Sequence, residues 1–405
     1  MAPENAATRA GVYVNQLSGE LQYKAFIPRP LPPDPPVSID MELWQCVSDA
    51  DRALGRLDGV SERIPNPDLF VAMYVRKEAV LSSQIEGTQA SLVDVLEYEA
   101  GTAKRGLPTD VREVVNYVDA MNYGLSRLQE LPLSLRLIRE IHERLLRDVR
   151  GSEHSPGEFR TSQNWIGPRG CVLSEATFIP PPPNEMTKAM ADLENFLHDT
   201  SPMPQLVKMG LAHAQFETIH PFLDGNGRVG RLLITFLLCQ GGILRLPLLY
   251  LSYYFKLNRQ EYYDRLMATG DKGDWEGWLK FFLRGVQAVS QQATETSRRI
   301  VAMREEHQQV VRDRVPGISN GLNLLDMLYA RPIVTVKSAR RMLGVSVASA
   351  NKLVGHFQKV GLLDQISPGA RNRVFAYAPY LDLFLDKASP EILLPPPATT
   401  GAEEP

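Results

Sequence analysis

Hydrophobic residues recur with a helical period along most of the chain, from about residue 40 to residue 315. Apolar side chains three and four positions apart lie on one face of a helix, so this spacing predicts a mainly helical protein. The last predicted helix has a polar second half and ends at Pro316-Gly317, which is typical of a connector between domains. The predicted helices cover residues 40–55, 67–86, 89–101, 109–129, 134–149, 184–199, 203–219, 228–241, 258–269 and 274–312.

Two segments depart from the helical pattern. Residues 159–179 read FRTSQNWIGPRGCVLSEATFI, where Gly-Pro and Arg-Gly turn signals separate short apolar runs. This pattern predicts an irregular β-hairpin, or flap. Proline crowds residues 28–36, which we interpret as part of an extended surface arm over residues 1–39. The alternative for this stretch is a docking site for a proline-binding module.

The pattern changes again after residue 317. Short helices are predicted at 322–329, 335–343 and 346–360, followed by two extended runs at 362–367 and 373–377. Helix, turn, helix and a two-stranded ribbon in that order form the winged helix-turn-helix pattern. We therefore divide the chain into an arm (1–39), a helical domain (40–290), a helical linker (291–317), a winged helix domain (318–385) and a disordered tail (386–405).

The composition limits the number of domains and the class of protein. The 405 residues suffice for two or three domains at about 100–200 residues each. With 44% hydrophobic and 22% charged residues, the chain is not wholly disordered, collagen-like or a coiled coil. The net charge of −3 argues against a nucleic-acid partner only while the chain is treated as one body.

The charge is in fact unevenly distributed. Residues 320–380 contain eight Lys and Arg against two acidic residues, a net +6. A basic winged helix is a candidate DNA-binding domain, and a protein-docking or dimerisation module is the alternative. If it binds DNA, the second helix faces the major groove and the wing meets phosphates or the minor groove. The residues predicted to do so are Ser346, Ser349, Asn351 and Lys352 on the helix, and Arg371 and Arg373 on the wing.

Cysteine usage and targeting signals indicate a compartment. Cys46, Cys171 and Cys239 are widely spaced and odd in number, so they fit neither a disulfide framework nor a zinc site. We therefore expect a reducing environment. The longest apolar run is far shorter than the roughly 18 residues of a membrane span, and the N-terminus lacks the features of a signal peptide. The expectation is a soluble cytoplasmic protein.

Residues 220–231, HPFLDGNGRVGR, carry the most informative chemistry. The glycines of 225–227 let several backbone N–H groups point to one place, and the helix dipole that follows favours an anion there. Arg228 and Arg231 add guanidinium groups suited to phosphate oxygens, while Asp224 suits Mg²⁺ and His220 suits a base near neutral pH. These are the groups that an enzyme needs to transfer a phosphate-containing group from a nucleotide. The alternative is a glycine-rich turn between helices with solvated arginines and a capping aspartate.

This segment resembles the signature of the Fic family, His-x-Phe-x-Asp/Glu-Gly-Asn-Gly-Arg-x-x-Arg. All eight specified positions are filled, by His220, Phe222, Asp224, Gly225, Asn226, Gly227, Arg228 and Arg231. The resemblance extends over about residues 40–290 and implies a Fic-type helical domain. Most members with an intact motif transfer AMP from ATP to a Ser, Thr or Tyr hydroxyl of a protein.

The resemblance also implies a role for each motif residue. His220 would deprotonate the hydroxyl, and Asp224 would carry Mg²⁺ at the α- and β-phosphates. Asn226 and the backbone of 225–227 would cradle the phosphates, Arg231 would reach the γ-phosphate, and Phe222 would pack in the core. The full set expected to bind ATP or its phosphates within the motif is Asp224, Gly225, Asn226, Gly227, Arg228, Val229, Gly230 and Arg231.

Some Fic proteins carry an inhibitory helix with the pattern Ser/Thr-x-x-x-Glu-Gly/Asn. The run from Ser82 through Glu86 to Gly87 fits it. A Glu86–Arg231 ion pair would occupy the guanidinium that should receive the γ-phosphate, so ATP would bind with misplaced phosphates. The alternative is a surface glutamate ahead of a helix-ending glycine.

Two further regions follow from the resemblance. Family members present the target chain along the flap by adding a strand to its edge. Candidate contacts are Trp165, Ile166, Gly167, Thr177 and Phe178, with a buried core position as the alternative for Trp165. An aromatic face can stack on adenine, and Tyr262 and Tyr263 are the candidates for this base pocket.

The sequence leaves three functional alternatives. The first is a protein adenylyltransferase, which takes ATP and Mg²⁺, acts on other proteins or on itself, and is restrained by Glu86. The second is a DNA-binding regulator whose Fic domain only senses nucleotide, although the intact His220 favours an enzyme. The third is a Fic enzyme that uses another donor, for UMP, phosphocholine or phosphate, or that removes AMP. A homodimer is implied by the resemblance alone.

Overall fold

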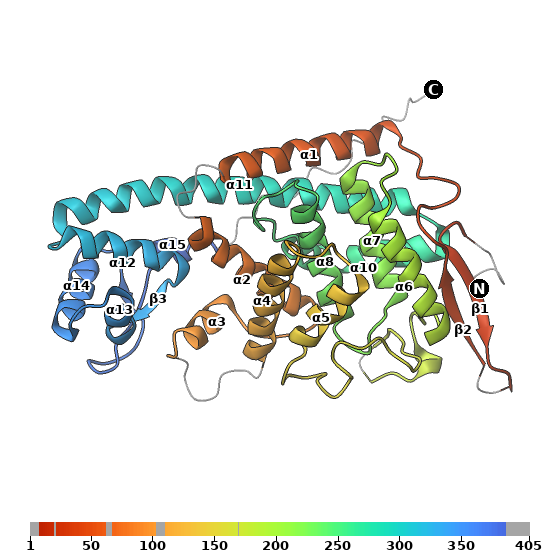
Figure 1. The fold of residues 1–405 in the computed structure, drawn as a ribbon, viewed down its shortest axis with the longest axis horizontal. Helices are drawn as coiled ribbons and strands as arrows, with labels where there is room; N and C mark the ends of the chain where they lie inside the picture. Colours follow the sequence, from red (N-terminus) through yellow and green to blue (C-terminus); the bar gives the residue numbers. More distant parts are fainter. Residues whose placement is uncertain (1–7, 20–21, 62–66, 103–109, 169, 386–405) are drawn as a thin grey trace, which may run out of the picture.

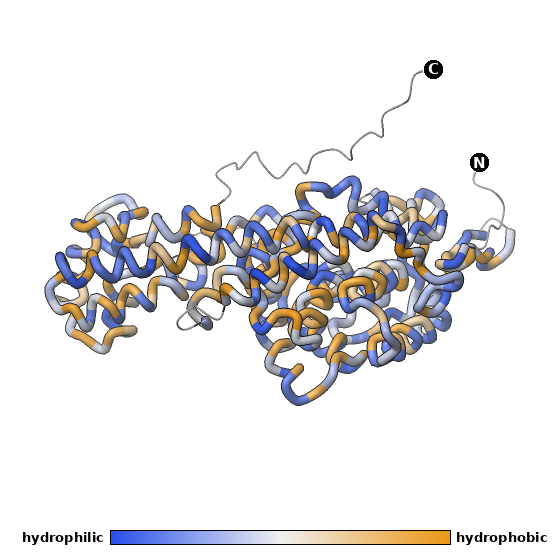
Figure 2. The backbone as a smooth tube through the Cα atoms, turned by 90° about the horizontal axis from the view of Figure 1, so that it is seen from above, coloured by the Kyte–Doolittle hydropathy of each residue, from blue (hydrophilic) through white to orange (hydrophobic). Residues whose placement is uncertain are grey.

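A single long helix organises the molecule. The structure is a computed structural model that describes residues 8–19, 22–61, 67–102, 110–168 and 170–385. Helix α11 (Trp275–Arg314) runs along the long axis, and α1 (Met41–Ser61) lies beside it (Figure 1). Figure 2 shows the same elongated molecule from above. Helix α1 continues to residue 61 rather than 55 because Leu57 and Ser61 extend the buried face of Leu43, Ala50 and Leu54.

The helical period predicts the remaining helices well. The structure contains α2 (Pro67–Ile85), α3 (Leu92–Glu99), α4 (Asp110–Arg127), α5 (Leu135–Leu145), α6 (Pro183–His198), α7 (Gln205–Ile219), α8 (Asn226–Gln240), α9 (Ser252–Leu257) and α10 (Arg259–Lys272). The six-residue α9 was not expected, because it is shorter than a periodic pattern can reveal. Helices α7 and α8 are buried on nearly all sides, so the loop that joins them lies at the centre of this helical body.

The N-terminal arm holds a β-hairpin that the sequence pattern did not predict. Strands β1 (Gly11–Gln16) and β2 (Tyr23–Pro28) pair antiparallel, with Gly11 opposite Pro28. Phe26 is 1% exposed, its backbone N–H donates to the carbonyl of Ile179 (2.9 Å), and its ring lies 6.0 Å from that of Phe178. The arm is therefore docked on the segment that precedes α6.

The flap is less regular than predicted. Within the described parts of residues 159–179, the only β-pairing is a single antiparallel bridge between Ile166 and Phe178. A short 3₁₀ turn, Leu173–Glu175, lies between the two bridged residues. Gly167 and Pro168 directly follow Ile166, and proline cannot donate a ladder hydrogen bond, which explains why a hairpin does not extend from the bridge.

The C-terminal unit contains the predicted helices and an additional strand. Its elements are α12 (Ile318–Ala330), β3 (Ile333–Thr335), α13 (Val336–Leu343), α14 (Val347–Lys359), β4 (Asp364–Gln365), β5 (Val374–Ala376) and α15 (Ala378–Leu381). The expected two-stranded ribbon is a three-stranded antiparallel sheet of order β3-β5-β4. Thr335 and Ser346 cap α13 and α14, and Gly344 ends α13 in the left-handed region (φ 66°). The predicted tail, 386–405, lies outside the described residues.

This unit is not separated from the rest by a free linker. Helix α11 is continuous through residues 291–314, and Arg304 on it pairs with Asp326 of α12 (3.0 Å). The ring of Phe70 on α2 lies 4.9 Å from that of Tyr329, and the ring of Tyr74 lies 5.2 Å from that of Phe384. One continuous hydrophobic core therefore joins the C-terminal unit to α2.

The docked hairpin yields a stability prediction. We expect Phe26→Ala to lower the free energy of unfolding by about 3–5 kcal/mol, because it removes a buried aromatic ring and leaves a cavity. The matched control is Val14→Ala on the other strand, whose side chain is 39% exposed and which should cost far less. Urea unfolding followed by fluorescence measures both. Equal losses would mean that the hairpin is not packed on the helical body.

Candidate functional site

The loop between α7 and α8 brings the motif residues to one place. His220 ends α7 in the left-handed conformation (φ 51°, ψ 60°), and Gly225 (φ 80°) begins α8. The Nδ1 of His220 donates to the carbonyl of Glu217 (3.2 Å), since a carbonyl can only accept, so Nε2 is the unprotonated nitrogen. Burial lowers the pKa of His220 to about 4, which keeps the ring neutral at pH 7 and able to accept a proton.

Asn226 shapes this loop with its side chain. Its Oδ1 accepts from the backbone N–H of Phe222 (2.8 Å) and its Nδ2 donates to the carbonyl of the same residue (2.8 Å). The residue is 2% exposed and its side chain closes the loop. The predicted contact of Asn226 with phosphates stays a prediction, for which its backbone is the available part. Val229 is likewise fully buried, which leaves only its backbone for an anion.

His142, on α5, is a site residue that sequence reasoning missed. Its ring stacks on Phe222 at 3.7 Å with an interplanar angle of 6°. Its Nδ1 accepts from the N–H of Gly157 (2.8 Å), so its Nε2 carries the proton and donates to the carbonyl of Asp224 (3.0 Å). Burial lowers the pKa of His142 to about 4, in keeping with this neutral form. His142 thus holds the loop on either side of residue 223.

Arg160 and Asn164 fix the loop from the flap side. The Nε of Arg160 donates to the carbonyl of His220 (2.9 Å), and its backbone N–H donates to the carbonyl of Pro221 (2.9 Å). Asn164 donates to the carbonyl of Phe222 (2.8 Å). Neither could be assigned from sequence, because each acts across more than 50 residues on a backbone carbonyl that leaves no trace in side-chain chemistry.

Asp224 and Arg228 lie at the first turn of α8. The side chain of Asp224 is 34% exposed, and Arg228, almost fully buried, lies 3.5 Å from its Oδ1 and 3.2 Å from Glu113 on α4. One accessible carboxylate beside a helix N-terminus suits Mg²⁺, which proteins bind through one or two carboxylates together with substrate phosphates. Within the described residues, no group of three or more His, Cys, Asp or Glu forms a metal site without such a substrate.

Arg231 is buried, and two of its guanidinium nitrogens are bonded to the segment that ends α2. Its Nε donates to Ser82 Oγ (2.8 Å), and its Nη2 donates to the Ser82 carbonyl (3.0 Å) and to Glu86 Oε1 (2.6 Å). Gly227 makes room for this contact, because a Cβ there would lie 2.3 Å from Glu86 Oε1. Burial alone would raise the pKa of Glu86, but Arg231 outweighs it and holds the pKa below its usual value. Gly87, with φ 92°, turns the chain away.

Two buried carboxyl groups flank Arg231 and were not predicted. Glu217 faces Gly230, where a Cβ would lie 2.2 Å from Oε1, and burial raises the pKa of Glu217 to about 7. Glu78 on α2 accepts from the backbone N–H of Ser252 (3.1 Å) and from Tyr117 (3.3 Å), and burial raises its pKa as well. Glu86 is bonded directly to Arg231 and is its main counter-charge.

The two predicted base-pocket tyrosines differ. Tyr262 is 1% exposed, stacks on Phe255 at 4.4 Å and bonds to His213 Nε2 (2.9 Å), so it belongs to the core rather than to an open pocket wall. Tyr263 is 37% exposed and remains available to a base. His213, which bonds to Tyr262, also contacts the motif: its Nδ1 lies 3.0 Å from the carbonyl oxygen of Gly230.

The predicted flap residues divide in the same way. Trp165 is 40% exposed and its indole N–H donates to the Cys171 carbonyl (3.0 Å), which excludes the buried alternative. Ile166, Gly167 and Thr177 are exposed too. Phe178 is 9% exposed and packs toward Phe26, so its predicted target contact is corrected to a structural one.

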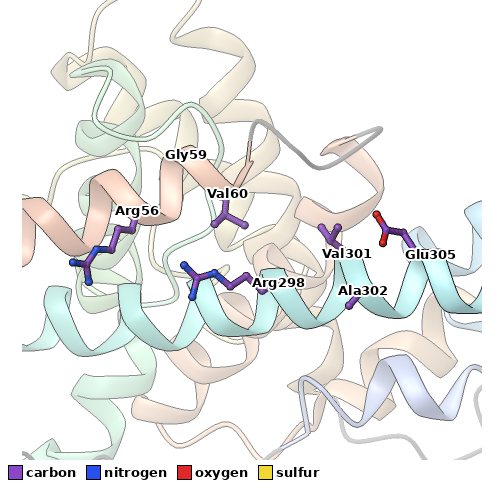
Figure 3. Close-up of a pocket in the computed structure, with 7 residues that line it drawn as sticks. All are labelled: Arg56, Gly59, Val60, Arg298, Val301, Ala302 and Glu305. Atoms are coloured by element: carbon purple, nitrogen blue, oxygen red, sulfur yellow. The ribbon is translucent and has the colours of Figure 1, made fainter.

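A separate groove lies between α1 and α11 (Figure 3). Its lining consists of Arg56, Gly59, Val60, Arg298, Val301, Ala302 and Glu305. It contains none of the motif residues. The described helices also include none apolar over a long enough stretch to cross a bilayer.

Parts of the chain match models of known protein families. Residues 44–126 match the model "Fic/DOC family N-terminal", and residues 132–238 match "Fic/DOC family". The chain is 31% identical over 181 residues to a probable protein adenylyltransferase of Aquifex aeolicus (43% of this chain, 51% of the relative). It is 29% identical over 238 residues to the protein adenylyltransferase Fic of Drosophila melanogaster (58% of this chain, 44% of the relative).

Residues 44–126 and 132–238 are therefore similar to Fic/DOC family domains, and the chain spans about half the length of these relatives or less. The fold is also similar to that of a Fic family protein from Desulfovibrio desulfuricans G20, with a TM-score of 0.56 and 20% identity. That match covers 84% of this chain and 97% of the other.

The clamp made by His142 yields a prediction. We expect His142→Ala to lower the free energy of unfolding by about 2–5 kcal/mol, because it removes a stacked ring and leaves two buried backbone groups unpaired. Amide hydrogen exchange of residues 221–227 should accelerate with it. His154→Ala, at an exposed histidine of the neighbouring loop, is the control. Unchanged exchange in residues 221–227 would contradict the clamp.

Proposed function

We propose that this chain, with its Fic/DOC family domains, is a protein adenylyltransferase that moves AMP from ATP to a Ser, Thr or Tyr hydroxyl of a protein. One observation carries the proposal: the loop from His220 to Arg231 gathers a neutral imidazole, an accessible carboxylate, a helix N-terminus and a buried guanidinium. Relatives named protein adenylyltransferases support it.

The reaction assigns a task to each of these groups. The unprotonated Nε2 of His220 takes the proton as the target hydroxyl oxygen attacks the α-phosphorus. The bond from that phosphorus to the bridging oxygen breaks, and pyrophosphate leaves. The backbone N–H groups that open α8 bind phosphate oxygens, and Arg231 binds the terminal phosphate. Asp224 would hold Mg²⁺, which neutralises phosphate charge.

We also propose that the ion pair between Glu86 and Arg231 inhibits the enzyme. The carboxylate oxygen lies 2.6 Å from Nη2, in the position where a phosphate oxygen would have to bind. A buried guanidinium can satisfy one anion at that atom, so Glu86 and the terminal phosphate compete for it. Without Arg231, the α-phosphate is not held in line with the attacking hydroxyl.

Removal of the carboxylate tests the proposed activity and its inhibition together. We expect Glu86→Gly to raise incorporation of label from α-³²P-ATP into protein by at least about tenfold, since each 1.4 kcal/mol of lost competition is a factor of ten. Glu86→Gln, which keeps the side chain's size, should give a smaller rise.

The control is the double variant Glu86→Gly, His220→Ala, which should incorporate no label. Label with the double variant would contradict the base role. Equal labelling by the wild type and Glu86→Gly would contradict the inhibition. Parallel reactions with UTP, GTP and CTP test whether the enzyme uses another nucleotide donor. Loss of AMP from a labelled target protein tests whether the enzyme removes AMP. A DNA-binding regulator that only senses nucleotide would bind ATP but transfer no AMP to protein.

The helix that carries the inhibitory segment is held at its other end by the C-terminal unit, which we propose is a winged helix domain. Phe70 and Tyr74 of α2 pack on Tyr329 and Phe384, and they lie about three and two turns before Ser82, respectively. The hydroxyl of Tyr74 also bonds to Ser297 of α11 (2.9 Å). These contacts fix where α2 presents Glu86, so we propose that the C-terminal unit helps to keep the enzyme inhibited.

Loss of this support should loosen the inhibition. We expect Phe70→Ala to raise labelling several-fold in the otherwise wild-type chain and to have no further effect in the Glu86→Gly background, because both changes act on the same ion pair. Leu54→Ala, a buried position on α1, controls for general destabilisation. A rise from Phe70→Ala that adds in full to that from Glu86→Gly would contradict the mechanism.

A further inference from the structure

The C-terminal unit exposes positive charge that the proposed transfer reaction does not use. Among the described residues, seven of its lysines and arginines are exposed and none of the seven forms an ion pair: Arg331, Lys337, Arg340, Arg341, Lys352, Lys359 and Arg371. Of its two acidic residues between 320 and 380, Asp326 is paired with Arg304 (3.0 Å). The positive charge of this unit is therefore left to the solvent or to an anionic partner.

The helices that carry this charge have one free side. Helices α13 and α14 pack on each other, and α13 also contacts α12 and β3. On α14, Ala350, Leu353, Val354 and Phe357 are buried, whereas Ala348, Ser349, Asn351 and Lys352 are exposed. The small side chains at the start of α14 let its first turns approach a groove closely. Figure 1 shows this unit at the end of the molecule opposite the N-terminal hairpin.

The wing is joined to the same face. Arg373 lies in the turn between β4 and β5. It donates to the Oδ1 of Asn351 on α14 (2.7 Å), and its guanidinium lies over the ring of Phe375 at 5.1 Å. This contact places the turn with the exposed Arg371 beside the exposed side of α14. It also means that Asn351 and Arg373, both predicted to contact DNA, already bind each other, and the Ser349 hydroxyl bonds to that of Ser346 (3.0 Å). Lys352 and Arg371 are therefore the free groups on this side.

We propose that the C-terminal unit binds double-stranded DNA, with the first turns of α14 in the major groove and the wing on the adjacent phosphates. A helix flanked by a basic wing fits a duplex, because the major groove admits one helix and the phosphates lie on either side of it. A protein partner does not require seven exposed, unpaired cations against two acidic residues in 320–380, so the charge of the unit favours DNA over a docking surface.

Salt dependence gives the sharpest test. The full chain is titrated into a fluorescein-labelled mixed-sequence duplex of about 30 base pairs, and anisotropy is read from 50 to 200 mM KCl. If five phosphates are neutralised, the affinity should fall about 20-fold between 100 and 200 mM. Lys352→Gln and Arg371→Gln should each weaken binding about three- to tenfold and reduce the slope by about one.

The controls separate this proposal from the transfer reaction. Lys188→Gln changes an exposed lysine on α6 and should leave binding unchanged. His220→Ala should bind DNA like the wild type, so a failure of the adenylyltransferase proposal would not touch this one. The same strand in single-stranded form should bind more weakly. An absence of binding at 50 mM KCl, or an affinity that is flat across the salt series, would overturn the proposal and favour a protein-docking unit.

Discussion

The structure depends on how the buried guanidinium of Arg231 is paired. Arg231 is 2% exposed at its side chain and lies in the core between α2, α7 and α8. A guanidinium in such a place must be paired, because an uncompensated buried charge costs several kcal/mol. Glu86 and Ser82 supply the partners in the described state. In the function we propose, the oxygens of a nucleotide phosphate bind the same guanidinium nitrogen as the oxygen of Glu86. The pairing of Arg231 therefore links the stability of α2 to the binding of nucleotide.

The rest of the site holds the motif loop in a fixed geometry. Phe222 is held between the ring of His142 and the amide of Asn226, while Arg160 holds the carbonyl of His220. These side chains are used for support, so the backbone at the start of α8 and the neutral ring of His220 are left to contact substrate in the function we propose. Rigid support of this kind is what positions a base to within hydrogen-bonding distance of a hydroxyl.

The sequence predicted the parts that rest on local spacing. Helical periodicity located the main helices, and the spacing of Ser82 and Glu86 indicated a segment that the structure pairs with Arg231. It did not predict what depends on distant packing. Phe26 reaches Phe178 across more than 150 residues, and His142 reaches Asp224 across 82. The same limit explains Tyr262, which was predicted to line the base pocket. Its burial against Phe255 and His213 depends on distant packing and cannot be read from the Tyr262-Tyr263 pair in the sequence.

The central claim is that Glu86 occupies the place of the terminal phosphate on Arg231. The most direct measurement is a crystal structure of Glu86→Gly with a non-hydrolysable ATP analogue and Mg²⁺, compared with the wild type under the same conditions. The account predicts a terminal phosphate oxygen within about 3 Å of Arg231 Nη2 in the variant, a normal charge-assisted hydrogen bond, and in the wild type either no ordered terminal phosphate or one displaced from Arg231. A wild-type structure with Glu86 and the terminal phosphate both bonded to Arg231 Nη2 would contradict it.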